Sequence, residues 1–280
     1  MTRLVGIIGN PLAHSISPIF QQAAFDFLKL PIQYKIWETR PSEFKLNIQN
    51  LRSFEYLGAN ITIPYKEQVI QYVDDLDSKA RLIGAINTIV KRDNKLIGYN
   101  TDAFGFINSI RSNSNFNFKD KKILILGAGG AARAAAFSMI DEEIMSLTIA
   151  NRTLKRASDL ADNLSGFINV DISDLKSPVF EESVRKSNLI VNASSVGMAH
   201  TILENKNLII ADWISPGSLI FDMVYNPLIT PLIKEAKKAE AEVISGLSML
   251  IYQGAESFKL WTDEEAPIQI MAEAAELVLK

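Results

Sequence analysis

Short runs of apolar residues alternate along the chain with stretches in which apolar residues recur every three or four positions. The runs predict buried strands, and the longer spacing predicts helices. In the first part of the chain the predicted helices are Pro18–Leu28, Tyr65–Val73 and Ala103–Ser109. The predicted strands there are Leu4–Ile8, Gln33–Glu38, Ala59–Ile63, and a hairpin of Ala85–Val90 and Lys95–Tyr99 around Asp93 and Asn94.

A polar stretch from Ser109 to Asp120 separates this part from a second one with a more regular alternation. Strands with helices between them are predicted at Ile123–Leu126, Leu147–Ala150, Phe167–Val170, Leu189–Ala193 and Leu219–Met223. An alternation of strand and helix is typical of a mostly parallel, doubly wound sheet. We therefore expect an α/β protein with an N-terminal α/β domain followed by a Rossmann-type domain.

The last part of the chain is helical by its spacing, with predicted helices at Ile229–Ala239, Met249–Trp261 and Ile268–Leu279. The final helices have no predicted strands of their own to cover, so we expect them to pack back on the first domain. The predicted substrate-binding and catalytic domain is therefore residues 1–102 with 247–280, and the predicted nucleotide-binding domain is residues 103–246.

Composition narrows the class of protein. Apolar residues make up 48% of the 280 and charged residues 22%, as in soluble globular proteins. The net charge of −3 argues against a nucleic-acid or anionic-membrane partner, and no run approaches the ~20 apolar residues of a membrane span. The chain has no cysteine, which fits a cytoplasmic enzyme and excludes thiol chemistry. With two histidines and no metal-binding motif, no metal site is expected.

A glycine-rich loop follows the strand Ile123–Leu126 and precedes an alanine-rich helix. Its residues fit the pattern GxGxxA, and those expected to contact a cofactor are Gly127, Ala128, Gly129, Gly130 and Ala131. In such loops the first glycine permits the tight turn, the second lets the backbone approach a pyrophosphate, and the helix N-terminus binds the phosphate. The loop predicts a dinucleotide site, although a tight glycine turn that binds nothing has the same pattern.

The end of the next strand distinguishes between the two dinucleotides. NAD enzymes usually carry an acidic residue there for the ribose 2′-hydroxyl, but this strand ends in Asn151, Arg152 and Thr153, with Arg156 shortly after. Arginines can hold a 2′-phosphate through charge-assisted hydrogen bonds worth roughly 1.5–3 kcal/mol each. The alternative is two solvated surface arginines. We therefore predict NADP as the cofactor.

Two serines follow the first strand, in the segment GNPLAHSISP. Ser17 followed by Pro18 predicts a helix start with the serine as N-cap. The hydroxyls of Ser15 and Ser17 beside a helix N-terminus could also bind a small anion such as a carboxylate. The nearby His14 is a possible acid/base group, but a structural role is the stronger expectation.

Lys66 is the main candidate for a general acid/base. It lies in the segment GANITIPYK, in which Asn60 and Thr62 are predicted to point to one face by strand alternation. A lysine in the first turn of the predicted helix Tyr65–Val73 meets an unfavourable helix dipole, which suits proton transfer. A surface lysine balanced by Glu67 is an equally good interpretation.

Asp102 is the second candidate, in the segment Asn100-Thr101-Asp102 ahead of a predicted helix. It could simply cap that helix. It also lies where the first domain passes into the second, a kind of location that ligand sites favour.

Nine segments, taken together and in order, resemble the shikimate dehydrogenase family over essentially the whole chain. They are GNPLAHSISP, GANITIPYK, GAINT, NTD, LGAGGAARA, NRT, NASSVGM, DMVYNP and SGLSMLIYQGAESFKLW. The resemblance implies reversible hydride transfer between NADPH and the C3 carbonyl of 3-dehydroshikimate, in aromatic amino acid and chorismate biosynthesis. The small-molecule substrate is then shikimate or 3-dehydroshikimate, and the protein is expected to be a monomer or homodimer.

The same resemblance assigns roles to individual residues. It implies that Ser15 and Ser17 bind the substrate carboxylate and that Lys66 and Asp102 are the catalytic pair. Further substrate contacts fall on Asn60, Thr62, Asn87, Tyr225 and Gln253. The loop Ala128–Ala131 corresponds to the diphosphate site, and the 2′-phosphate site comprises Asn151, Arg152, Thr153 and Arg156. The nicotinamide side is assigned to Met223, Gly246 and Met249, although both methionines could be ordinary core residues.

Some positions depart from the family pattern. Phe20 and Gln21 stand where the family usually has His-Asn, and the family usually has glycine near Ala241 and Asp263. None of these is a catalytic position. The alternatives left open are a quinate/shikimate dehydrogenase with broader substrate or cofactor use and a catalytically silent NADP-binding regulatory relative. A methylene-tetrahydrofolate dehydrogenase-like enzyme would give no reason for the paired serines.

Overall fold

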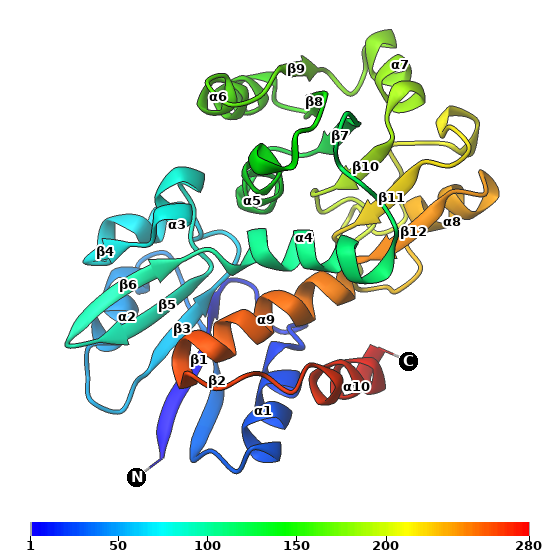
Figure 1. Cartoon of the computed structure of the whole chain (residues 1–280). Helices are drawn as coiled ribbons and strands as arrows, with labels where there is room; N and C mark the ends of the chain where they lie inside the picture. Colours follow the sequence, from blue (N-terminus) through cyan, green and yellow to red (C-terminus); the bar gives the residue numbers. More distant parts are fainter. Residues whose placement is uncertain (1, 280) are drawn as a thin grey trace. The chain divides into compact units, whose positions relative to one another are not determined.

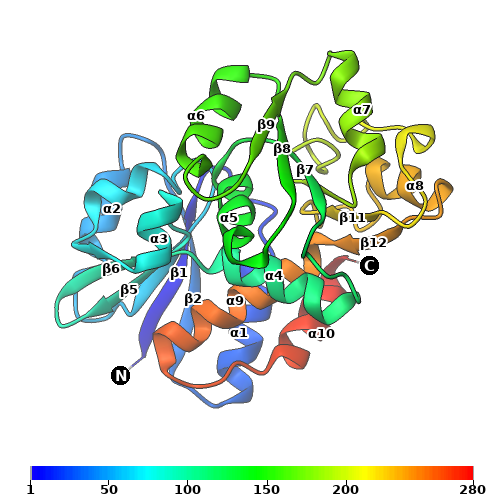
Figure 2. The same cartoon turned by 45° about the horizontal axis from the view of Figure 1, so that its top comes forward.

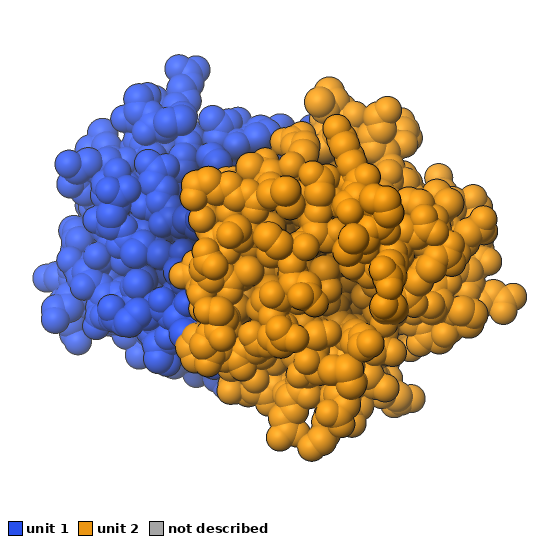
Figure 3. Space-filling view, turned by 90° about the horizontal axis from the view of Figure 1, so that it is seen from above, with its two compact units in different colours: residues 1–105, 251–280 blue, residues 106–250 orange. Residues whose placement is uncertain are grey.

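Two six-stranded sheets organise the chain in the computed structural model, which describes residues 2–279 (Figure 1). Each sheet belongs to one of two compact units, which Figure 3 distinguishes by colour. Unit 1 comprises residues 1–105 and 251–280, and unit 2 comprises residues 106–250. These boundaries lie a few residues beyond those predicted, because two helices run continuously through them.

The sheet of unit 1 has the strand order β2-β1-β3-β5-β6-β4. Its parallel pairs are β1 with β2, β1 with β3 and β4 with β6, whereas β5 is antiparallel to both β3 and β6. The sheet is therefore mixed. The strands are β1 (Arg3–Gly9), β2 (Ile32–Glu38), β3 (Gly58–Ile61), β4 (Asp75–Leu76), β5 (Thr88–Arg92) and β6 (Lys95–Tyr99).

Helices from both ends of the chain complete unit 1. They are α1 (Ser17–Phe27), α2 (Phe44–Asn50), the 3₁₀ helix η1 (Gln68–Tyr72), α3 (Ser78–Ile83), the start of α4 (Thr101–Asn113), most of α9 (Gly246–Thr262) and α10 (Ile268–Leu279). The C-terminal helix α10 packs against α1, as both views show (Figures 1 and 2). A hydrogen bond from Trp261 Nε1 to the carbonyl of Ile89 also ties α9 to the sheet. The predicted return of the C-terminal helices to the first domain is confirmed.

The sheet of unit 2 is entirely parallel, with the order β12-β11-β10-β7-β8-β9. Within unit 2 the first strand is the central β7. The chain then passes outward through β8 and β9, returns to the other side of β7, and continues outward through β10, β11 and β12. This is the doubly wound order in which ligands bind where the winding reverses, here between β7 and β10. The strands are β7 (Lys122–Leu126), β8 (Ser146–Ala150), β9 (Val170–Ser173), β10 (Leu189–Asn192), β11 (Leu219–Asp222) and β12 (Glu242–Ser245).

Two helices of unit 2, α7 (Pro178–Lys186) and α8 (Pro231–Lys238), start at residues whose side chains cap them. The Ser177 hydroxyl accepts a hydrogen bond from the amide of Val179 ahead of α7, and the Thr230 hydroxyl accepts one from Ile233 ahead of α8. A proline follows each capping residue, in the position where its missing N–H costs nothing. The helices are α5 (Gly130–Ser138), η2 (Ile140–Glu142), α6 (Leu154–Leu164), α7 (Pro178–Lys186), η3 (Ala211–Trp213) and α8 (Pro231–Lys238).

The helix predicted at Tyr65–Val73 is wrong. The strand β3 ends at Ile61, turns follow, and only the short 3₁₀ helix η1 forms. Tyr65 and Val69 are both buried in the unit 1 core, and their four-residue spacing imitated a helix. Lys66 therefore lies in a turn, and the helix-dipole argument for it does not apply.

Other predicted boundaries also differ from the structure, among them the starts of β5 at Thr88 rather than Ala85 and of α9 at Gly246 rather than Met249. The strand predicted at Phe167–Val170 begins only at Val170, because the backbone of Phe167 and Ile168 closes the end of α6 on the carbonyl of Leu164. The helix α4 continues to Asn113, into the predicted polar break, because its apolar face remains buried through Ile110. The helices α2 and α3 and the strands β4 and β12 were not predicted, since each has few residues and a weak apolar pattern.

At the two places where the family pattern has glycine and this chain does not, the backbone adopts a conformation that disfavours other residues. Glu240 and Asp263 have φ values of 56° and 60°, in the left-handed region. Glycine adopts that region without steric penalty, whereas other residues are disfavoured there. Asp263 is also engaged by Arg92, whose Nη2 lies 3.0 Å from its Oδ1.

Gly58 provides a test of how the unit 1 sheet closes on α9. A Cβ at this position would lie 2.0 Å from the carbonyl oxygen of Ile89 and 2.7 Å from Trp261 Nε1, the pair that joins β5 to α9. We predict that Gly58→Ala lowers the free energy of unfolding by roughly 1–3 kcal/mol, the usual cost of overpacking. Urea unfolding followed by tryptophan fluorescence measures this.

The matched control is Gly166→Ala. A Cβ there meets no atom within 4 Å, so the unfolding midpoint should stay close to that of the parent protein. Equal midpoints for the two variants would show that the close approach at Gly58 does not constrain the fold.

Candidate functional site

Lys66 and Asp102 form an ion pair in unit 1. Lys66 Nζ donates to Asp102 Oδ2 over 2.6 Å, and the two side chains are only 17% and 7% exposed. A pair shielded from water interacts more strongly than a surface pair. Of the two interpretations of Lys66, a surface lysine balanced by Glu67 is therefore wrong.

Asp102 is available for this pair because another residue caps its helix. The amide of Ala103, in the first turn of α4, donates to the side-chain oxygen of Asn100 at 3.2 Å. The other carboxylate oxygen of Asp102 accepts from Asn87 Nδ2 at 2.9 Å. The interpretation of Asp102 as a simple helix cap is therefore wrong: both its oxygens face other side chains.

The side chain of Asn87 connects the ion pair to the helix α9. Its Nδ2 lies within hydrogen-bond distance of Asp102 Oδ1, of Thr101 Oγ1 at 2.9 Å and of Gln253 Oε1 at 3.1 Å. Its Oδ1 accepts from the backbone amide of Thr101 at 2.7 Å. A buried amide held by this many partners has a fixed orientation. Asn87 therefore brings Gln253 of α9 and Asp102 of α4 into one group.

A second layer of buried polar residues supports Asn87. Asn60 Nδ2 donates to the carbonyl of Asn87 and to Ser257 Oγ at 3.2 and 3.0 Å. Asn60 Oδ1 accepts from the Tyr34 hydroxyl at 2.7 Å. Burial raises the pKa of Tyr34 well above its usual value, so this hydroxyl remains a donor. The nitrogen and the oxygen of the Asn60 amide thus both form hydrogen bonds with residues of unit 1, including the backbone of Asn87.

Sequence reasoning missed several members of this layer, namely Tyr34, Thr88, Thr101 and Ser257. Signals for some of them were present. Thr88 and Thr101 belong to the segments GAINT and NTD, and Ser257 lies four residues after Gln253 on the same face of α9. Tyr34 carried no such signal, because it alternates with its neighbours like any buried strand residue.

The two serines lie at the start of α1. Ser17 is the first helical residue rather than the N-cap, which is Ile16, so the predicted capping role is wrong. The amide of Ser17 donates to Ser15 Oγ at 3.4 Å. Among residues 2–279 the Ser17 hydroxyl has no hydrogen-bond partner, although the residue is only 6% exposed. His14 is exposed in the turn before them, and the half-buried Thr62 follows the end of β3.

In unit 2 the glycine loop has the shape that a pyrophosphate requires. Gly127 has a φ of 118°, and a Cβ there would lie 3.0 Å from the carbonyl oxygen of Ala193 at the end of β10. A Cβ on Gly129, the N-cap of α5, would meet no atom within 4 Å. The first glycine is therefore required by the protein itself, whereas the second leaves open space over the helix N-terminus. Ala132 is fully buried, as close packing of helix on strand requires.

The two arginines after β8 are exposed. Within the described part of the chain, neither Arg152 nor Arg156 has a carboxylate within salt-bridge distance, whereas Lys155 between them pairs with Asp159. Asn151 Nδ2 donates to the carbonyl of Thr153, which fixes the turn that presents them. Two unpaired guanidinium groups beside the glycine loop suit a phosphate monoester.

The residues assigned to the nicotinamide side come together at the ends of β11 and β12. Met223 is half-buried, and a Cβ on Gly246 would lie 2.1 Å from the carbonyl oxygen of Met223. Gly246 is therefore required for the close approach of these two segments. Met249 is 7% exposed, and burial raises the pKa of Tyr225, a predicted substrate contact that follows Met223 in the chain.

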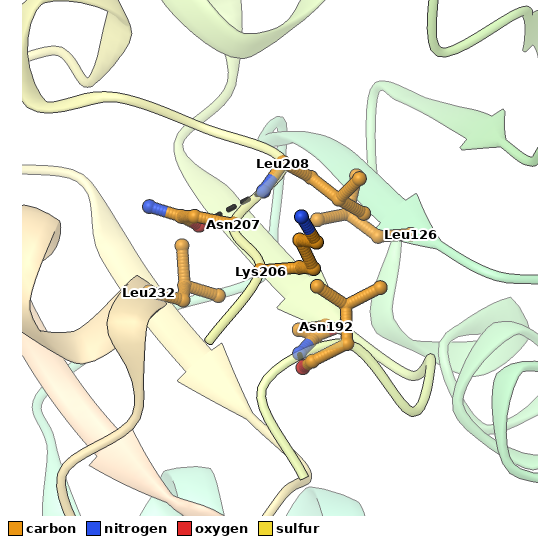
Figure 4. A pocket seen from close by; sticks show the side chains of 7 residues that line it. Leu126, Asn192, Lys206, Asn207, Leu208 and Leu232 are labelled. Atoms are coloured by element: carbon orange, nitrogen blue, oxygen red, sulfur yellow. Dashed lines mark hydrogen bonds between the residues drawn. The ribbon is translucent and has the colours of Figure 1, made fainter. Parts of the chain in front are cut away.

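Two cavities lie apart from these residues. Figure 4 shows a hollow of about 10 Å³ in unit 2, lined by Leu126, Asn192, Val196, Lys206, Asn207, Leu208 and Leu232. That volume suffices for roughly one water molecule. A cavity of about 310 Å³ in unit 1 is lined by Ile8, Ile36, Trp37, Glu38, Asn47, Asn50, Leu51 and Tyr56. Neither is lined by Lys66 or Arg152.

Between residues 2 and 279 no group of three or more histidine, aspartate or glutamate side chains is placed to hold a metal ion. In the same range no helix has both the length and the apolar character that crossing a membrane requires.

Comparison with known proteins gives consistent matches over the whole chain. Residues 7–89 match the family model of the shikimate dehydrogenase substrate binding domain, residues 110–248 that of shikimate/quinate 5-dehydrogenase, and residues 246–276 that of the shikimate 5′-dehydrogenase C-terminal domain. A curated relative from Methanothermobacter thermautotrophicus, shikimate dehydrogenase (NADP(+)), is 37% identical over 278 residues, which is 99% of this chain and 97% of the relative.

Solved structures agree with these sequence matches. A crystal structure of shikimate dehydrogenase in complex with NADP+ has a TM-score of 0.92 and 38% identity, covering 100% of this chain and 96% of that one. The enzyme from Thermus thermophilus, in complex with NADP(H) and shikimate, has a TM-score of 0.89 and 32% identity, covering 99% of this chain and 100% of that one. The predicted fold class is thereby confirmed, and the chain belongs to the shikimate dehydrogenase family.

Proposed function

We propose that the protein is an NADP-dependent oxidoreductase that interconverts 3-dehydroshikimate and shikimate, with Lys66 and Asp102 as its catalytic pair. Its family membership supports the reaction and the cofactor. The observation that carries the assignment of residues is the shielded ion pair, 2.6 Å from Lys66 Nζ to Asp102 Oδ2. The pathway that this reaction serves is aromatic amino acid and chorismate biosynthesis.

Bound NADPH supplies the hydride for the carbonyl carbon. Lys66 Nζ donates a proton to the carbonyl oxygen and recovers one in the reverse direction. Asp102 orients Lys66 through their ion pair and accepts from a substrate hydroxyl. The Ser15 and Ser17 hydroxyls bind the substrate carboxylate, and further contacts come from Thr62, Asn87, Tyr225 and Gln253. Asn60 remains a proposed substrate contact, and its amide also supports Asn87 from within the unit.

The residues of unit 2 fit NADP. We propose that Gly127, Ala128, Gly129, Gly130 and Ala131 bind the diphosphate, where Gly129 leaves open space over the N-terminus of α5. Asn151, Arg152, Thr153 and Arg156 would bind the adenosine 2′-phosphate, and Met223, Gly246 and Met249 would lie on the nicotinamide side. Cytoplasmic location and a monomeric or homodimeric state remain predictions. Light scattering coupled to gel filtration measures the oligomeric state.

A direct assay tests the function. Purified protein with shikimate and NADP+ should produce reduced nicotinamide, which its absorbance follows. Replacing shikimate by quinate, or NADP+ by NAD+, should give a much lower kcat/KM. No turnover of shikimate would leave the silent regulatory relative as the better interpretation. Comparable rates on quinate would instead identify an enzyme of broader specificity.

The role of Lys66 is tested by Lys66→Met. Removal of a general acid/base usually lowers kcat by about 10²–10⁴-fold, and the KM for shikimate should change far less. The control is Lys45→Met on α2, an exposed lysine in the same unit that forms no ion pair among the described residues. A kcat of Lys66→Met close to that of the control would show that Lys66 does not transfer the proton.

Cofactor choice is tested by Arg152→Ala and by the double variant Arg152→Ala/Arg156→Ala. Loss of a charge-assisted hydrogen bond should raise the KM for NADP+ by about tenfold or more for the single change and leave that for NAD+ nearly unchanged. Lys155→Ala is the control, because it removes one positive charge from a position between the two arginines. If Lys155→Ala has an equal effect, general surface charge rather than a phosphate clamp attracts the cofactor.

A further inference from the structure

The buried carboxylate of Asp222 joins three separate segments at the carboxyl ends of the unit 2 strands. It is 0% exposed. Its Oδ1 accepts from Asn192 Nδ2 at 2.9 Å and from the amide of Val224 at 3.1 Å. Its Oδ2 accepts from the Thr230 hydroxyl at 2.5 Å. One side chain thus connects the end of β10, the segment after β11 and the N-cap of α8.

These segments adjoin the cofactor loop. Asn192 at the end of β10 pairs with Leu126 at the end of β7, and the carbonyl of the next residue, Ala193, limits the space at Gly127. The segment that Asp222 holds through the amide of Val224 carries Met223 and Tyr225. On its other side, the same segment is pressed against Gly246. Its backbone is therefore fixed by a close contact and by the carboxylate.

We propose that Asp222 is a positioning residue, which in its ionised form holds Met223 where the nicotinamide half of NADP binds. The inference rests on the nicotinamide-side role assigned to Met223 under the proposed function. Asp222 itself contacts neither reactant. It acts by accepting three hydrogen bonds, an arrangement that a carboxylate satisfies and a carboxylic acid does not.

Protonation would disturb this arrangement in a defined way. The Thr230 hydroxyl donates to Asp222 Oδ2 while its oxygen accepts from the amide of Ile233. A proton on Oδ2 would oppose the Thr230 hydroxyl proton, so that one of the two must turn away. Burial raises the pKa of Asp222 to about 6, against the effect of its three hydrogen bonds. The change therefore falls within an accessible pH range.

No charged group dominates the environment of Asp222. Residues 189–199 contain no ionisable side chain, and Glu242 of β12 lies at the opposite end of its strand from the residue that pairs with Asp222. Arg111 of α4 forms an ion pair with Glu142. Burial raises the pKa of Tyr225, so the Tyr225 hydroxyl remains neutral. The ionisable residues of α8 are Lys234, Glu235, Lys237 and Lys238, and none of them contributes to the shift.

The fold should not weaken in the same pH range. A carboxyl group with a raised pKa binds a proton more tightly in the folded chain than in the unfolded one, so its protonation favours the folded state as pH falls through about 6. Loss of cofactor affinity without loss of thermal stability there is the signature of a positioning role.

The central experiment compares Asp222→Asn with the parent protein. Asparagine has nearly the same shape but places an NH₂ group or a neutral oxygen toward Thr230, as the protonated acid does. We expect its Kd for NADP+, measured by calorimetry, to be about tenfold higher at pH 8, the effect of one charge-assisted hydrogen bond. The KM for shikimate should change less than the Kd for NADP+, since Tyr225 is only one of several residues proposed to contact that reactant.

The pH dependence of the Kd values distinguishes the positioning role of Asp222 from a purely structural defect. The ratio of the two Kd values should approach one at pH 5, where the parent protein is itself protonated. A ratio is required because the cofactor's own phosphate titrates near pH 6. A ratio constant from pH 5 to 8, or equal increases in both KM values with a lower Tm, would overturn the proposal. Asp212→Asn, an exposed aspartate in the same unit, is the control.

Three further variants keep the test decisive. If Asp222→Asn does not fold, Thr230→Val should weaken NADP+ binding at pH 8 whereas Thr230→Ser, which keeps the hydroxyl, should not. Equal binding by these two would overturn the proposal. Met223→Ala tests the premise: unchanged NADP+ binding would overturn the cofactor placement itself. Weaker binding by Met223→Ala but not by Asp222→Asn would overturn only the role of Asp222.

Discussion

The orientation of the Asn87 amide is the constraint on which the unit 1 site depends. Its oxygen is fixed by the backbone of Thr101, so its nitrogen must face Asp102 and Gln253. Asp102 can then bind Lys66 with its remaining oxygen. An amide cannot invert here without setting donor against donor, and a buried mismatch of that kind costs roughly 1–3 kcal/mol. The position of the lysine is thus determined through a chain of hydrogen bonds that begins at the backbone of Thr101 and passes through Asn87 and Asp102.

Unit 2 reaches a comparable result through close backbone contacts. At Gly127 the loop passes beside Ala193, and at Gly246 the start of α9 passes beside Met223. Each glycine belongs to a different segment, yet both allow neighbouring strand ends of the parallel sheet to converge. A parallel sheet places all these ends at one edge, which is why a single site can draw on β7, β8, β10, β11 and β12.

Much of the fold was predictable from the sequence, because long buried strands and amphipathic helices have clear periods. The strands β7, β8, β10 and β11 and the helix α10 were predicted within a residue or two. The turn that carries Lys66 was not, because Tyr65 and Val69 have helical spacing for reasons of core packing.

In the candidate site, too, residues with a local sequence signal were predicted and residues without one were missed. Charged and glycine residues in motifs were identifiable, whereas Tyr34 was not, since nothing local marks a tyrosine whose hydroxyl meets an asparagine on another strand. The capping of α4 by Asn100 rather than Asp102 also depends on tertiary geometry that spacing does not contain.

The exposure of Arg152 and Arg156 has a consequence for how the protein responds to its medium. Charges in contact with water are screened over about 8 Å at physiological ionic strength, whereas a shielded pair such as Lys66 and Asp102 is screened much less. If these residues act as proposed, dissolved salt weakens the selection of the cofactor and affects proton transfer much less. Ionic strength then alters which dinucleotide is chosen more than what is done with it.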